Sequence, residues 1–237
     1  MKALLFLFIA LSVVCGCNKT DSGTGDEQPG VWLTTATGNY MDGFIKPTGL
    51  IMTYKKTNYG NGAILFVLDH DGFVGTYVDS EGEANYAKYK EYAKYYGDTT
   101  YTGRHNMSEE EVVCAAPLKS INVVADRDFD ESHPAGTTLN DLFTFKYVAY
   151  YSFVKNGYKN RGGDVPSEYP TDSVAVLSEF KGASMFSDIS DYLAPLFFNK
   201  LPDTPGKYTF TVTLDFGEDP LTGEKVTVPP ASIEIEF

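Results

Sequence analysis

Three carboxylates stand at alternate positions in one short polar run, at Asp126, Asp128 and Asp130. Carboxylate oxygens are the ligands that hard cations such as Ca²⁺ prefer. The helix–loop–helix calcium pattern would also need glycine at the sixth position and glutamate at the twelfth, where this chain has Glu131 and Thr137. The run therefore favours a solvated acidic loop, with a calcium site as the weaker alternative. We expect no other metal and no cofactor.

Tyrosine is the second residue type with chemical potential, because the chain has 17 Tyr and 16 Phe but a single Trp. Aromatic rings stack on the apolar faces of sugars, and a tyrosine hydroxyl adds a polar contact. One group of tyrosines lies between residues 84 and 101, and another comprises Tyr147, Tyr150 and Tyr151. Either group is a candidate binding surface, and core packing is the competing interpretation.

Helical spacing divides the first tyrosine group into two arcs. A helix over 84–96 would place Tyr86, Tyr89 and Tyr96 on one face, which predicts core positions. Tyr92 and Tyr95 fall on the neighbouring arc, where we expect them to be exposed. Tyr92 and Tyr95 are therefore the candidate ligand-binding residues.

Two further acidic residues, Asp69 and Asp71, precede Gly72 after an apolar run. The Asp-x-Asp-Gly order resembles the first motif of haloacid-dehalogenase-type phosphatases, which also need Mg²⁺, a lysine and a parallel sheet. Here the run is followed by Phe73–Val78, which predicts a hairpin with a four-residue turn at 69–72. A turn is the favoured interpretation, and phosphatase chemistry or a calcium-binding turn is the alternative.

Other catalytic arrangements are weakly supported. The three histidines, His70, His105 and His133, are dispersed and have no metal-ligand spacing. Ser184 follows Gly182 and Ala183, but the second glycine of a nucleophile elbow is missing. Cys114 stands in an apolar run, which predicts a core thiol. With 32 acidic residues, a carboxylate pair for glycosidase chemistry is uninformative, so we expect no enzyme.

The elements that must position these residues are mostly strands. β-branched, aromatic or alternating runs predict strands at 31–37, 50–56, 63–68, 73–78, 121–125, 143–154 and 208–216, and two more around Pro229 and Pro230. Helices are predicted at 84–96 and 187–198, and one further turn at 138–143. No internal repeat is present, which excludes propellers and solenoids. The pattern predicts a mainly β fold, an antiparallel β-sandwich with two short helices.

Net charge restricts the partners. The formal charge of −13 excludes a nucleic-acid footprint and a polybasic attachment to anionic lipid. The composition is that of a folded protein, 43% hydrophobic and 22% charged.

The N-terminus predicts export. Lys2 precedes an apolar run from Ala3 to Val14, which is too short to cross a bilayer as a helix. The following residues, Val14-Cys15-Gly16-Cys17, resemble a bacterial lipobox, although Cys15 departs from the usual small residue. This resemblance implies cleavage after residue 16 and acylation of Cys17. An ordinary secretory signal is the alternative.

Two further segments carry resemblances. The run Ile121–Phe143, INVVADRDFDESHPAGTTLNDLF, is similar to a passage in uncharacterised lipoproteins of the Bacteroides group. The block PGKYTFTVTLDF from Pro205 is similar to the last hairpins of immunoglobulin-like domains. These resemblances imply an immunoglobulin-like sandwich and a cell-envelope location, and no activity.

The expected organisation is a lipoprotein signal peptide at 1–16, a flexible tether at 17–30 and one β-rich domain at 31–237, with a candidate division near residue 117. We expect a non-catalytic binding module, anchored to the outer membrane by the lipid on Cys17 and facing the periplasm or the cell surface. Its ligand would be a glycan or an envelope protein. The alternatives are a carbohydrate- or phosphate-processing enzyme and a structural subunit of a surface assembly.

Overall fold

The computed structural model describes residues 33–56, 60–75, 82–106, 111–159, 171–187 and 194–237. These residues form a mainly β structure, as the sequence predicts, and they include two helices. Cys17, the signal peptide and the tether lie outside the described residues. Within the described part of the chain, neither helix has the length and apolar character needed to span a membrane.

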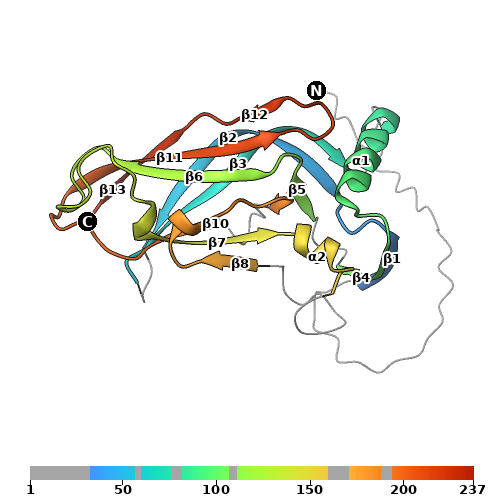
Figure 1. Cartoon of the computed structure of the whole chain (residues 1–237), viewed down its shortest axis with the longest axis horizontal. Helices are drawn as coiled ribbons and strands as arrows, with labels where there is room; N and C mark the ends of the chain where they lie inside the picture. The colour runs from blue at the N-terminus through green and yellow to red at the C-terminus, as the bar shows by residue number, and fades with distance from the viewer. Residues whose placement is uncertain (1–32, 57–59, 76–81, 107–110, 160–170, 188–193) are drawn as a thin grey trace, which may run out of the picture. The chain divides into compact units, whose positions relative to one another are not determined.

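The largest sheet has seven strands, and strands from both halves of the chain build it (Figure 1). Neighbouring strands are antiparallel, except that β5 pairs with β2 in parallel. In spatial order they are β5 (Val112–Cys114), β2 (Gly43–Lys55), β3 (Ala63–Gly75), β10 (Ala194–Phe198), β7 (Phe143–Ala149) and β8 (Thr171–Val174), with β9 (Phe186–Ser187) also paired to β7. A division near residue 117 would cut this sheet between strands that are hydrogen-bonded partners.

A second sheet has four strands arranged around β11 (Lys207–Glu218). β6 (Leu118–Ala125) pairs along one side of β11. On the other side lie β12 (Lys225–Thr227) and β13 (Ala231–Glu236), which flank Pro229 and Pro230. Prolines fit this position because they lie between two short edge strands, where no ladder hydrogen bond is lost.

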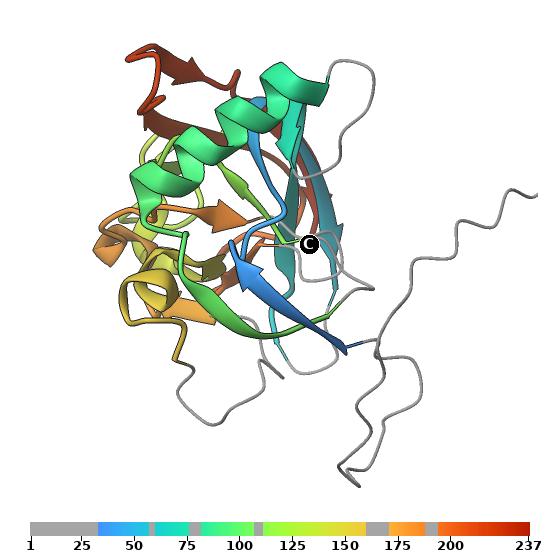
Figure 2. The same cartoon turned by 90° about the vertical axis from the view of Figure 1, so that its right-hand side faces the viewer.

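Two further strands and the two helices gather at one end of the protein (Figure 1). β1 (Leu33–Gly38) and β4 (Tyr101–Asn106) form a two-stranded antiparallel sheet. Helix α1 (Gly82–Tyr96) lies near this pair, and the short helix α2 (Tyr151–Lys155) follows β7 (Figures 1 and 2). Two 3₁₀ turns, η1 (Asn140–Leu142) and η2 (Leu177–Glu179), complete the described elements.

One hydrophobic core is shared by the two large sheets. Alternate residues of β11 are buried, namely Tyr208, Phe210, Val212, Leu214 and Phe216. They belong to the same buried cluster as residues of β3, β10 and β7 from the seven-stranded sheet. A period of two in burial is what a strand with one covered face produces, so the β11 pattern reports its packing on the other sheet.

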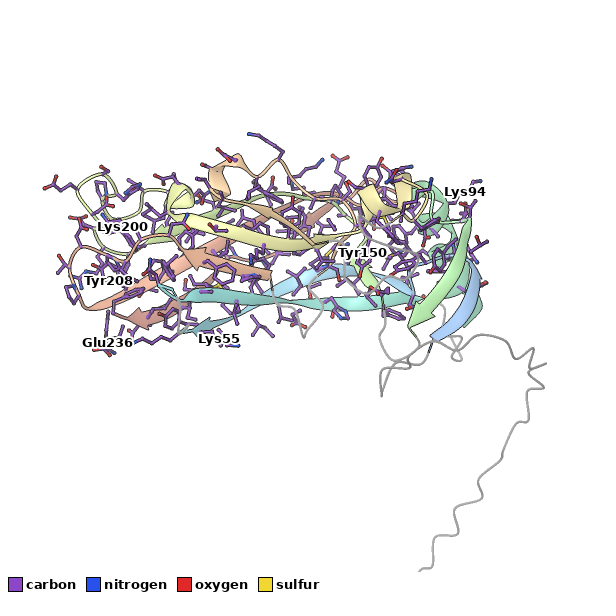
Figure 3. All side chains as sticks on the ribbon, turned by 90° about the horizontal axis from the view of Figure 1, so that it is seen from below. Lys55, Lys94, Tyr150, Lys200, Tyr208 and Glu236 are labelled. Carbon is purple, nitrogen blue, oxygen red and sulfur yellow. The ribbon has the colours of Figure 1, made fainter. Side chains whose placement is uncertain are left out.

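A second core is rich in tyrosine and lies at the α1 end of the protein. Tyr208, which belongs to the first core, lies at the opposite end (Figure 3). Buried tyrosines need partners for their hydroxyl groups. The Tyr89 hydroxyl donates to the carbonyl of Met41 at 2.7 Å, and the Tyr96 hydroxyl donates to the carbonyl of Ala115 at 2.5 Å. The Tyr150 hydroxyl donates to the Glu111 carboxylate. Each ring is therefore both packed and hydrogen-bonded.

The predicted turn at 69–72 is wrong, because β3 continues through it to Gly75. Asp69 and Asp71 pair with Gly49 and Lys46 of β2. The β2–β3 register shifts twice in this region, so bulges accommodate the polar residues without reversing the chain. The two aspartates thus stand along an exposed part of a long ribbon, which is not the strand end that phosphatase chemistry requires.

The predicted helix at 187–198 is also wrong where the structure describes it. Ser187 ends β9, residues 188–193 lie outside the described residues, and Ala194–Phe198 form β10 between β3 and β7. Leu196 and Phe198 are buried, and Pro195 and Phe197, which alternate with them, are half-buried. Strand pairing on both sides therefore outweighs the helical spacing of the apolar residues.

Candidate functional site

A pocket with a volume of about 280 Å³ opens where three segments meet. The segments are the β5–β6 connection with the start of β6, the end of β7 with the start of α2, and the stretch 181–184 before β9. Its lining residues are Pro117, Leu118, Lys119, Tyr147, Ala149, Tyr151, Ser152, Lys181, Gly182, Ala183 and Ser184. This volume is close to the lower end of the range for ligand sites, roughly 300 Å³, and suits a small polar ligand.

A backbone contact holds two walls of the pocket together. The N–H of Leu118 donates to the carbonyl of Ala183 at 2.9 Å, and the N–H of Ala183 donates to the carbonyl of Leu118 at 2.8 Å. Gly182 has φ +95°, and a Cβ there would lie 2.9 Å from the Leu118 carbonyl oxygen. Only glycine combines this φ with such a close approach. The conformation of the pocket wall therefore requires glycine at position 182.

Backbone strain lies directly beside the same wall. Met185 has φ +53°, which is unusual for a residue with a side chain, and it is fully buried. The N–H of Tyr150 donates to its carbonyl at 3.1 Å, which ties the strained residue to the start of α2. Strained residues of this kind persist where the surroundings fix them, and they are concentrated at functional sites.

The polar lining consists of ammonium, hydroxyl and phenol groups. Lys119 and Lys181 are exposed, Ser184 is half-buried, and Ser152 is exposed. The Tyr147 ring is half-buried and packs on Phe145 and Phe180, with ring centroids 5.1 and 5.2 Å apart. Ammonium and hydroxyl groups are hydrogen-bond donors to oxygen, and a tyrosine ring offers apolar surface, a combination that suits a sugar residue.

Tyr151 links the pocket to helix α1. Its side chain is 40% exposed, and Lys155 places its ammonium 5.3 Å from the ring centroid. Tyr151 lies edge-on to Tyr96 with centroids 6.3 Å apart, and the exposed Tyr95 lies edge-on to the same Tyr96 ring at 5.0 Å. Two exposed tyrosines therefore flank one buried tyrosine, and one of the two lines the pocket.

The two candidate ligand-binding tyrosines differ in exposure. Tyr95 is 59% exposed, as expected, but the exposure expected of Tyr92 is wrong because its side chain is only 2% exposed. The Tyr92 ring packs against Phe44 with centroids 5.2 Å apart, and its hydroxyl donates to Oδ2 of Asp219 at 2.6 Å. Burial, followed by this hydrogen bond, raises the pKa of Tyr92. Tyr92 is thus a core residue, whereas Tyr86 on the predicted core face is 39% exposed.

The three aspartates of the acidic loop are engaged by different parts of the protein. Asp126 accepts from the N–H of Thr209 at 2.9 Å, and Asp128 accepts from the N–H of Ala135 at 2.8 Å. Asp130 instead contacts Lys200 at 2.9 Å. No group of three potential metal ligands is found among the described residues. The alternate spacing therefore does not produce a convergent calcium site at Asp126, Asp128 and Asp130.

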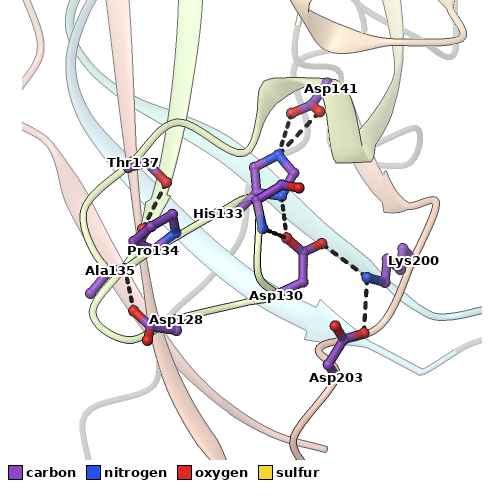
Figure 4. Close-up of polar contacts among 10 residues, drawn as sticks. Asp128, Asp130, His133, Pro134, Ala135, Thr137, Asp141, Lys200 and Asp203 are labelled. Atoms are coloured by element: carbon purple, nitrogen blue, oxygen red, sulfur yellow. Dashed lines mark hydrogen bonds and ion pairs between the residues drawn. The ribbon is translucent and has the colours of Figure 1, made fainter.

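Asp130 belongs to a charged network centred on His133 (Figure 4). His133 Nδ1 lies 2.6 Å from Asp130 Oδ1, and Nε2 lies 3.1 Å from Asp141 Oδ2. Lys200 bridges Asp130 and Asp203 at 2.9 and 2.8 Å. The hydrogen bond from Lys200 holds the pKa of Asp130 well below its usual range. Both ring nitrogens of His133 are occupied, so the network joins the loop to its surroundings and leaves neither nitrogen open to a substrate.

Asp98 and Glu111 are buried acids that sequence analysis did not anticipate, as is Asp219, the partner of Tyr92. Asp98 accepts from the N–H groups of Tyr40 and Met41 at 2.8 and 2.9 Å and from the Tyr158 hydroxyl at 3.0 Å. Burial raises the pKa of Asp98, although these hydrogen bonds act in the opposite direction. Glu111, 5% exposed, accepts from Tyr150. The Asp98 carboxylate thus satisfies backbone and phenol donors, and the Glu111 carboxylate satisfies a phenol donor. Such partners are typical of structural groups.

Sequence reasoning missed the pocket itself, because Lys119, Tyr151 and Lys181 come from distant parts of the chain. The signals present were the second tyrosine group, which contains Tyr151, and the isolated Gly182. Cys114 is buried, as predicted. Comparison of the chain with protein-family models, with curated proteins and with solved structures finds no match.

Proposed function

We propose that this protein is a lipid-anchored, non-catalytic binding protein of the bacterial cell envelope, and that it binds a glycan in the pocket between β6, α2 and residues 181–184. The observation that carries the proposal is the pocket lining. It combines an exposed tyrosine ring, serine hydroxyls and lysine ammonium groups around a space sized for a small ligand.

The ring of Tyr151 is the proposed stacking surface. Ring stacking needs an accessible face and a fixed orientation, and Tyr151 is 40% exposed while packing edge-on against Tyr96. Tyr95, the remaining residue of the candidate pair, also packs edge-on against Tyr96. We propose that Tyr95 contacts a ligand that extends beyond the pocket.

The finer fold class and the location are part of the proposal. We propose an antiparallel, immunoglobulin-like sandwich, supported by the single core to which both large sheets contribute. The outer membrane location and the anchor at Cys17 rest on the resemblance of Val14–Cys17 to a lipobox. Either face of the outer membrane is compatible with this anchor.

The test is a glycan array followed by titration of any ligand found. Tyr151→Ala removes the stacking ring and should weaken binding by about tenfold, equivalent to roughly 1.4 kcal/mol. Tyr86→Ala is the matched control, since Tyr86 is 39% exposed, packs on another tyrosine and has a lysine ammonium near its ring, yet does not line the pocket. Tyr86→Ala should leave affinity unchanged.

Equal loss of affinity in both variants, or none in either, would exclude the pocket as the binding site. Absence of binding to every glycan on the array would contradict the proposed function. Thermal unfolding of both variants serves as the folding control, and neither should lose more than a small part of its stability because both side chains are exposed.

A further inference from the structure

We infer that the pocket selects an anionic sugar residue, carrying either a carboxylate or a sulfate. This inference rests on the proposed glycan-binding function and concerns the class of ligand. Its basis is a pair of lysines, Lys119 and Lys181, that line the pocket together, while none of its described lining residues is acidic.

Among the described residues, neither lysine is engaged by a carboxylate, in contrast to four other lysines of this protein. The ammonium groups of Lys46, Lys200, Lys207 and Lys225 contact carboxylates at distances between 2.5 and 3.4 Å. Across the described part of the chain, no ion pair includes Lys119 or Lys181. Their positive charges are therefore available to a ligand without breaking an existing ion pair.

Backbone hydrogen bonds hold the two chain segments that carry these lysines next to each other. Lys119 follows Leu118, and Lys181 stands two residues before Ala183. Leu118 and Ala183 exchange two backbone hydrogen bonds. The stem of Lys119 also packs on Gly217, where an added Cβ would lie 2.9 Å from Cε of the lysine. Both side chains thus start from one hydrogen-bonded backbone frame, and both line the same pocket.

Electrostatics make this pair selective. The chain has a net charge of −13, so most of its surface repels anions. A recess with two cations and buried apolar residues, Leu118 and Ala183, strengthens the field inside it. The hydroxyl groups of Ser152 and Ser184 supply neutral donors in the same pocket. A neutral sugar would use the donors and the tyrosine ring but would gain nothing from the two charges.

The experiment uses calorimetric titration of the protein with three probes: oligogalacturonate, its uncharged methyl ester, and a sulfated galactose oligosaccharide. The variants are Lys119→Gln and Lys181→Gln. Lys94→Gln is the matched control, because Lys94 is an exposed lysine on α1 that does not line the pocket and its substitution removes the same charge (Figure 3).

We expect at least one anionic probe to bind about tenfold more tightly than the ester, the size of one charge-assisted hydrogen bond. Lys119→Gln and Lys181→Gln should each remove about this factor, Lys94→Gln should not, and raising the salt concentration should weaken the anionic probe alone. The two anionic probes decide between carboxylate and sulfate.

Equal affinity for the ester and both anions would overturn the inference and leave glycan binding intact, as would an equal loss in Lys94→Gln. Failure of all three probes, with neutral glycans binding on the array, would overturn it in the same way. Failure of every glycan would overturn the proposed function, and this inference with it.

Discussion

The phenol of Tyr92 and the carboxylate of Asp219 form a buried polar pair that joins α1 to the β11–β12 turn. Besides the Tyr92 hydroxyl, Asp219 accepts from the N–H groups of Leu221 and Thr222 at 2.9 and 3.3 Å. Asp219 is 3% exposed, so it depends on these donors rather than on water. Loss of one donor leaves a buried acceptor incompletely satisfied.

Tyr92→Phe should therefore lower the free energy of unfolding by roughly 1–3 kcal/mol, because it keeps the ring and removes the donor. Tyr92→Ala, which removes the ring as well, should cost about 3–5 kcal/mol. Tyr95→Ala is the control and should change stability by no more than about 0.5 kcal/mol. Urea denaturation measures all three, and similar losses in Tyr92→Phe and Tyr95→Ala would contradict the buried pair.

His133 gives the protein a pH-dependent contribution to stability. Burial alone would lower the pKa of His133, but hydrogen bonds with Asp130 and Asp141 outweigh it and raise the pKa. Lys200 and Asp203 are the other charged groups of the network. Because the folded pKa lies above the unfolded value of about 6.5, the stabilisation is complete below that pH and is lost as the pH rises through the folded pKa.

We expect His133→Gln to be less stable than the wild type at pH 5.5, and the difference to shrink toward pH 8.5. His70→Gln, which replaces an exposed histidine of β3 outside this network, is the control variant. The measurement is the free energy of unfolding at several pH values. A difference between wild type and His133→Gln that stays constant or grows with pH would show that the two carboxylates do not favour the charged imidazole.

At the scale of elements, the segment from η2 to β9 determines the shape of the pocket. It carries Gly182, the strained Met185 and two lining residues with polar side chains, Lys181 and Ser184. The segment has almost no regular structure of its own, and its hydrogen bonds go to Leu118 and Tyr150. Its conformation is therefore set by neighbours from other elements.

Gly182→Ala should both destabilise the protein and weaken ligand binding, since the added Cβ meets the Leu118 carbonyl at 2.9 Å in addition to the positive φ. Gly136→Ala is the matched control, because Gly136 has φ +77° and no atom within 4 Å of an added Cβ. The control should lower the free energy of unfolding by about 1–2 kcal/mol, which is the cost of a left-handed conformation for alanine. If thermal unfolding shows the same loss in both variants, the close approach at Gly182 does not constrain the pocket.

The sequence patterns predicted the structure correctly where the spacing of apolar residues within one element matches the face that is buried. Helical spacing located α1, and alternation located β11, because a single neighbouring layer covers each of them. They failed at Asp69–Gly72, where residues typical of a turn lie in a bulged strand. They also failed at Ala194–Phe198, where pairing with β3 and β7 makes the segment a strand. They also placed Tyr92 on the wrong side of α1, since Asp219, its partner, is distant in the chain. The pocket shares this dependence on distant residues.

At the scale of the whole molecule, the proposed anchor determines where the binding pocket works. Acyl chains contribute about 0.8 kcal/mol for each buried CH₂ group, and more than one chain holds a protein stably to a membrane. Cys17→Ala should therefore move the protein from the membrane fraction to the soluble fraction and abolish incorporation of radiolabelled palmitate. Equal palmitate labelling of the wild type and Cys17→Ala would contradict the anchor, and Cys114→Ala controls for loss of a thiol.

The position of β10 has a consequence for biogenesis. β10 lies between β3 and β7, although it is formed by residues 194–198 near the end of the chain. Before these residues emerge, β3 and β7 each present an unpaired edge, and such edges pair readily with other chains. The seven-stranded sheet thus cannot close in the order in which its strands leave the ribosome, because β10 follows both of its neighbours in the chain. We expect products truncated before β10 to expose both edges, which favours aggregation or proteolysis.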